Sequence, residues 1–201
     1  MKPTLLVLSV VAVLATFTGC AEMPAQDLDA AKQALDNAKS AQAADYAPDA
    51  WRVASDAETR LEAELAAQGD RSALFRSYSK ARDMAAEVKR NAEQAVADAA
   101  TGKEKAKEEA TQLMAQAKQA NEQAQHDLAS APKGKGTEAD LASLKSDTES
   151  AQTTLQDMEG AFDRGDYLGA KIKAQAVIQA ADQVRKEIEK AKSARNGERH
   201  A

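Results

Sequence analysis

The sequence has few of the residues on which enzymes depend. It contains one cysteine, two histidines, one tryptophan, three tyrosines and three phenylalanines in 201 residues. The histidines, His126 and His200, are far apart, and neither has a partner at the spacing of a metal site or a catalytic triad. Gly134 and Gly136 are not followed by the Lys-Ser/Thr pair of a phosphate-binding loop. We therefore expect no enzyme, no cofactor or metal, and no small-molecule substrate.

Charge argues against a further class of partner. The chain has 32 acidic and 27 basic residues, a formal net charge of −5, whereas a nucleic-acid partner calls for a basic face. Charged residues make up 29% of the chain, and alanine dominates the apolar ones. This composition is typical of long helices and coiled coils rather than of a thick globular core.

The first twenty residues form a recognisable export signal. Lys2 gives a positive start, an apolar run covers residues 5–17, and small residues lead to Cys20. This arrangement predicts a secretory signal peptide over residues 1–19, and the run is too short for a transmembrane helix. Residues 20–26 would then be a tether. A cysteine without a partner is unusual in an oxidising compartment, unless it is used for something other than a disulfide.

The sequence Phe17-Thr18-Gly19-Cys20 resembles the lipobox of bacterial lipoproteins, with Phe17 in place of the usual leucine. The resemblance implies that Cys20 carries acyl chains and that a membrane is a partner. Ala21 stands where an aspartate would favour the inner membrane, so the resemblance implies an outer-membrane lipoprotein that faces the periplasm. The alternative is an ordinary signal peptide with an incidental cysteine.

The remaining chain predicts an all-α fold. Apolar residues recur at alternating three- and four-residue steps, which places them on one face of each helix. We expect an elongated set of antiparallel helical hairpins, similar to a coiled coil, around one long helix. The predicted helices cover about residues 27–44 with Asp27 as cap, 48–68, 71–130, 138–163 and 167–195. They form two units, 27–130 and 138–195, with a linker at 131–137 and a tail at 196–201.

The long helix contains Gly102, which could interrupt it. The seam that begins with Leu74 and Tyr78 keeps its heptad phase beyond Gly102 through Ala106 and Leu113. A single glycine costs a helix only about 1 kcal/mol. We therefore expect one continuous helix, with two helices joined at Gly102 as the alternative.

An internal similarity relates the two halves. Gly69-Asp70 and Gly165-Asp166 both look like hairpin turns, and a step of 96 residues places the seam of 74–95 on that of 170–191. This favours two copies of one helical hairpin. Any two heptad helices can be aligned in this way, so a chance match remains the alternative.

Six aromatic residues follow the signal peptide, and all lie beside expected turns. One interpretation is that they fill the bundle ends, where an alanine seam leaves gaps. The other is a partner-docking patch, for which Tyr46 and Trp51 are the candidates because aromatic anchors dominate binding energies.

Residues 28–96 resemble a family of alanine-rich envelope lipoproteins that is known only as a domain of unknown function. The resemblance depends on an alanine-rich first helix, the Tyr46-Ala47-Pro48 turn and the Gly69-Asp70 turn. It implies lipoprotein helical hairpins and no particular activity.

Three functions fit these patterns. The first is a lipid-anchored periplasmic rod with a structural or protein-interaction role, which binds an envelope protein or itself. The second is a stress-protective amphipathic protein, because residues 103–110 look like the Ala/Lys/Glu repeats of desiccation-protection proteins. The third is a carrier of lipid or unfolded protein, for which alanine seams leave little room.

Overall fold

The computed structural model describes residues 22–131 and 138–199, which contain helices and no strands. The all-α prediction is confirmed. The predicted signal peptide, Cys20 and most of the predicted linker lie outside the described residues. The elements are α1 (Ala25–Ser40), α2 (Ala43–Tyr46), α3 (Pro48–Gly69), the 3-10 helix η1 (Ala73–Phe75), α4 (Ser79–Ala129), α5 (Glu138–Asp163) and α6 (Tyr167–Arg199).

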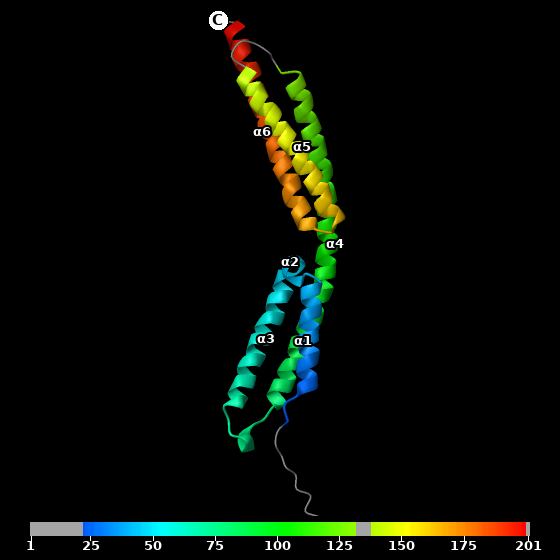
Figure 1. Ribbon diagram of the computed structural model, residues 1–201, viewed down its shortest axis with the longest axis vertical. Coiled ribbons are helices and arrows are strands. Elements are labelled where there is room, and N and C mark those ends of the chain that lie inside the picture. Colours follow the sequence, from blue (N-terminus) through cyan, green and yellow to red (C-terminus); the bar gives the residue numbers. More distant parts are fainter. Residues whose placement is uncertain (1–21, 132–137, 200–201) are drawn as a thin grey trace, which may run out of the picture.

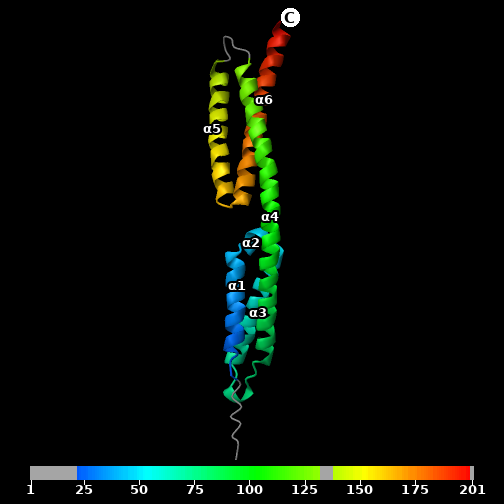
Figure 2. The same cartoon turned by 90° about the vertical axis from the view of Figure 1, so that its right-hand side faces the viewer.

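The molecule is a slender rod made of two three-helix bundles that share α4 (Figures 1 and 2). Helices α1 and α3 pack against the first part of α4, and α5 and α6 pack against the later part. In each bundle the chain runs along the rod, back, and along it again (Figure 1). With 51 residues at 1.5 Å per residue, α4 is about 77 Å long and spans both bundles.

A stripe of alanines on α4 explains this thin shape. Buried residues recur along the helix at steps of three, four or seven residues, and all but Asn121 are alanine or valine. Small side chains let the helix axes approach closely, and each contributes little apolar area. The buried residues of α4 are Ala81, Ala85, Val88, Ala92, Ala95, Ala99, Ala106, Ala110, Ala117, Asn121 and Ala124.

The predicted continuity of the long helix through Gly102 is confirmed, but its predicted start is wrong. The helix begins at Ser79 rather than near Arg71, and Leu74, expected in the seam, is 88% exposed. The chain before Ser79 forms an irregular connection with a short 3-10 turn. The prediction placed Leu74 in the seam from its heptad spacing alone. That spacing does not distinguish an apolar residue in a helix from one in a loop.

Three other helix ends differ from the prediction. The first helix starts at Ala25, so Asp27 lies in its first turn instead of capping it. It stops at Ser40, and the separate short helix α2 follows. At the other end of the chain, α6 continues to Arg199, and Asn196-Gly197 does not end it.

The two Gly-Asp pairs do different things. Gly165 has a φ of 78°, and the amides of Gly165 and Asp166 donate to the carbonyls of Phe162 and Ala161. These bonds form a Schellman motif, after which the carboxylate of Asp166 accepts from the Gly169 amide and caps α6. Gly69, in contrast, is the last residue of α3 and is followed by the longer connection.

The similarity between the two halves therefore holds in the helices and not in the turns. Residues 78–92, at the start of α4 and its cap, and their counterparts 96 positions later in α6 are buried at the same five places. The outer pairs differ, since Leu74 and Ala191 are exposed. The two bundles also share the same order of helix directions (Figure 1). The matched pairs are Tyr78 and Ala174, Ala81 and Val177, Ala85 and Ala181, Val88 and Val184, and Ala92 and Ile188.

The alanine seam makes a direct prediction. Ala85→Leu places a large side chain in a fully buried position of α4 and should lower the free energy of unfolding by about 1–3 kcal/mol. The adjacent Ala86 is exposed, and Ala86→Leu should change stability little, since both residues favour helix. Urea unfolding followed by circular dichroism compares the two. Equal effects would contradict a closely packed seam.

Candidate functional site

The two bundles meet at a waist, which we define as the turn of residues 41–47, the α4 residues Gly102 and Lys103, and the α5–α6 turn at Gly165. The turn connects α1 through α2 to α3 and passes over α4 at Gly102. A Cβ atom on Gly102 would lie 2.0 Å from the Tyr46 carbonyl oxygen. Gly102 is therefore required for the close approach of two backbones rather than for a break in the helix.

The Tyr46 side chain contacts the second bundle. Its hydroxyl donates a hydrogen bond to the Gly165 carbonyl at 3.3 Å, which joins residues 119 positions apart. The Lys103 ammonium lies 5.6 Å from the centre of the Tyr46 ring and donates to the Gln42 side-chain oxygen at 3.1 Å. Gln42 itself has a φ of 58°, a left-handed conformation that is costly for this residue. The waist is thus a specific joint, held by both backbone and side-chain contacts.

The surroundings of Tyr46 shift its protonation. Partial burial raises the pKa of the Tyr46 hydroxyl, the backbone of Tyr167 lowers it, and the carboxylates of Asp166 and Asp45 raise it, with a net increase. The hydroxyl therefore keeps the proton that it donates to Gly165 throughout the neutral range. The environment suits a structural hydrogen bond and not a proton-transfer group.

Tyr46 and Trp51, the predicted docking residues, lie in the same region. Both are half-buried and pack against the core of the first bundle. Tyr46 makes contacts within the chain, so it acts here as a joint. Trp51 lies at the start of α3, one turn after the waist.

The aromatic residues mostly fill the bundle ends, as one interpretation of the sequence expected. Tyr78 is buried, and Phe162 and Tyr167 pack edge-to-face beside the waist with ring centres 5.1 Å apart. Phe75 is the exception, because 75% of it is exposed. Local sequence does not distinguish Phe75, since it lies next to a turn like the other aromatic residues.

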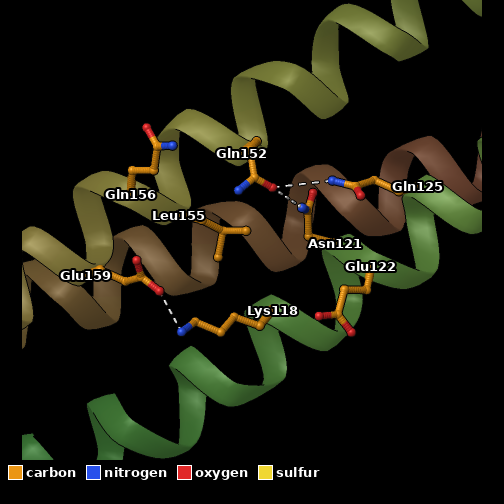
Figure 3. Close-up of a pocket in the computed structure, with 8 residues that line it drawn as sticks. All are labelled: Lys118, Asn121, Glu122, Gln125, Gln152, Leu155, Gln156 and Glu159. Atoms are coloured by element: carbon orange, nitrogen blue, oxygen red, sulfur yellow. Dashed lines mark hydrogen bonds and ion pairs between the residues drawn. The ribbon is translucent and has the colours of Figure 1, made fainter.

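A groove lies between α4 and α5 in the second bundle (Figure 3). It has a volume of about 360 Å³. Lys118 and Glu159 form an ion pair across it at 2.6 Å. Its lining is polar apart from Leu155 and comprises Lys118, Asn121, Glu122, Gln125, Gln152, Leu155, Gln156 and Glu159.

Asn121 lies at the base of this groove and is only 2% exposed. Its amide nitrogen donates to the Gln152 side-chain oxygen at 3.1 Å, and its own side-chain oxygen has no hydrogen-bond partner in the described part of the chain. Gln125 donates to the same Gln152 oxygen (Figure 3). Polar walls of this kind do not suit an acyl chain or an unfolded apolar segment.

Within residues 22–131 and 138–199, no three His, Cys, Asp or Glu side chains are grouped so that they could hold a metal ion. Over the same ranges, none of the helices carries an apolar stretch of the length that a bilayer crossing requires.

Comparisons with protein-family models, with curated proteins and with solved structures find no match.

The close contact at the waist can be tested with glycine substitutions. Gly102→Ala would gain about 1 kcal/mol from helix propensity, but its Cβ would force the Tyr46 backbone away. We expect a net loss of stability of about 1–3 kcal/mol. Gly69→Ala is the matched control, because nothing lies within 4 Å of its Cβ position, and it should be neutral or stabilising. If Gly102→Ala were also stabilising in chemical unfolding, the waist contact would be wrong.

The Tyr46 hydrogen bond predicts a pH-dependent effect. Tyr46→Phe should lower stability by about 0.5–1.5 kcal/mol at pH 7. Because the pKa of Tyr46 is raised above its ordinary value of 10.0 in the folded state, its contribution is complete below pH 10 and is lost as the pH rises further. The difference between the two proteins should therefore shrink above pH 10 in urea titrations. A difference that stays constant to higher pH would argue against this bond.

Proposed function

We propose that this protein is an outer-membrane lipoprotein, held by acyl chains on Cys20, whose rod-like domain extends into the periplasm and acts as a structural or interaction element of the cell envelope. The observation that carries the proposal is a rod of two bundles around one continuous helix, with the described chain beginning at one end (Figure 1). An anchor two residues before Glu22 would attach the rod by that end.

The packing of the chain favours a rod over a desiccation-protective protein. Residues 103–110, which look like protective repeats, are part of α4 and take part in tertiary contacts. Ala106 and Ala110 are buried, and Glu109 pairs with Lys171 of α6. A protective segment of this type would gain its helix on drying or on a membrane surface, whereas this one already packs against two other elements.

The polar groove makes the carrier alternative weak. A lipid or an unfolded segment needs an apolar pocket, and Leu155 is the apolar residue among eight that line the groove. Binding of an envelope protein, or of a second copy of this chain, remains our proposal for how the rod acts.

Anchoring is tested by changing the cysteine. Cys20→Ser should abolish acylation and release the protein from membranes into the soluble periplasmic fraction, because the attachment depends on several acyl chains on this one residue. Mass spectrometry of the processed protein and membrane flotation measure the two effects. Ala21→Asp is the control: it should keep the acyl chains and move the protein to the inner membrane. A wild-type protein with a free Cys20 thiol would overturn the proposal.

A further inference from the structure

The connection between α3 and α4, residues 70–78, carries two strongly exposed apolar side chains. Leu74 is 88% exposed and Phe75 is 75% exposed, the highest values among the large apolar residues described. We call this connection the tip. Apolar side chains that are neighbours and almost fully exposed usually mark an interaction surface.

Hydrogen bonds give the tip a fixed shape. The Arg76 guanidinium donates to the carbonyls of Arg71 and Gly69 at 2.9 and 3.0 Å. The Ser77 amide donates at 3.0 Å to the side-chain oxygen of Gln68, which is itself only 4% exposed. Leu74 and Phe75 therefore project from a braced connection and are exposed because of its conformation.

The tip lies at the end of the rod where the described chain begins (Figures 1 and 2). An ion pair at 3.2 Å between Asp27 and Arg82 joins the first turns of α1 and α4 beside it. Met23, which precedes α1, is 52% exposed at this same end. Cys20 is two residues before Glu22, so their Cα atoms are at most about 7 Å apart.

We propose that the tip inserts Leu74 and Phe75 into the bilayer leaflet that holds the acyl chains of Cys20. This inference rests on the lipidation proposed above and adds a second attachment point at the same end of the rod. The tether and the tip together would hold the rod upright on the membrane surface, since a tether alone would leave it free to tilt.

The local charge fits a phospholipid surface. Residues 70–82 contain four basic residues and one acidic residue, whereas the whole chain has a net charge of −5. Anionic headgroups attract basic residues that lie next to inserted apolar side chains. The charged residues are Asp70, Arg71, Arg76, Lys80 and Arg82, of which Lys80 and Arg82 also pair with Glu64 and Asp27.

A tryptophan at the tip tests the insertion. Trp51 is the only tryptophan, so Trp51→Phe supplies a silent background for Phe75→Trp in the full chain, purified with its anchor and reconstituted in vesicles of zwitterionic and anionic phospholipids. We expect a blue-shifted emission that lipids brominated in the acyl chains quench. Ile172→Trp in the same background is the control, because Ile172 is 67% exposed in the second bundle, and it should give water-like, unquenched emission.

The outcomes separate this inference from the proposed anchor. If the protein is acylated and floats with the vesicles, but the tryptophan at position 75 is not quenched, the tip inference is wrong and the anchor stands. If the protein has no acyl chains and does not float, both are wrong. Quenching at both positions would mean that the rod lies flat, which also overturns the inference.

A double variant excludes a structural role for the two residues. Because both side chains are exposed, Leu74→Ser with Phe75→Ser should leave the thermal unfolding temperature unchanged. A large fall would mean that they stabilise the fold, and the insertion would lose its basis.

Discussion

The close approach of helix backbones is the constraint on which this structure depends. An alanine buries one methyl group, so each seam position contributes little apolar area and the helices must lie near one another to gain contacts. Gly102 is the limiting case, where even a methyl group would collide with the Tyr46 carbonyl. A chain with six large aromatic side chains beyond residue 20 can build a stable rod in this way, but not a thick core.

The two bundles are joined rigidly because they share the helix α4. Because α4 belongs to both, no flexible linker lies between them at the waist, and a bend there would have to break helical hydrogen bonds. The Tyr46 hydrogen bond to Gly165 adds a contact between elements on either side of this position. The joint therefore has both a continuous backbone and a lateral brace, which suits a protein that keeps two ends a fixed distance apart.

Periodicity in the sequence predicted the helices and most of the seam, because a heptad pattern is a direct consequence of burying one face. It also predicted continuity through Gly102, although the reason for the glycine, the Tyr46 carbonyl, is a contact across 56 positions that no local pattern reveals. Periodicity failed at Leu74, where apolar spacing continued into a connection. The side-chain oxygen of Gln68 holds that connection in its conformation by accepting a hydrogen bond from the Ser77 amide. Nothing in the sequence around Gln68 distinguishes it from other glutamines in polar helices.

The candidate sites were less predictable than the fold for the same physical reason. Tyr46 could be selected from its type and its turn, but its partner Gly165 lies in the other bundle. Phe75 differs from the other aromatic residues because its side chain is exposed. That exposure depends on the conformation of the whole connection between α3 and α4. Cys20 was predicted from its local pattern alone, because a lipidation signal would be read as sequence and not as tertiary structure.

A seam of identical alanines leaves one further problem, which is the register of the helices. Where alanine faces alanine, a slip of one heptad between two helices changes the contacts little, so those positions do not define the register; larger buried side chains such as Leu35 and Tyr78 contribute to it. Residues other than alanine therefore help to define the register. The Tyr46 backbone can approach α4 closely at Gly102, which has no Cβ atom, and the buried Asn121 donates a hydrogen bond to Gln152 of α5. A buried polar residue of this kind is known to fix register in coiled coils at some cost in stability.

The ion pairs between helices act in the same sense. Arg82 with Asp27, Arg60 with Glu87, and Arg185 with Asp127 each join two helices. The side chains of the first two pairs are exposed to water, whereas the third pair is partly buried. Pairs of this type contribute at most about 1 kcal/mol each. Their effect is larger on specificity, because each pair joins a different helix to α4, and a helix shifted along α4 would lose its own pair. In this rod, small side chains allow the helices to meet, and a few polar contacts determine where.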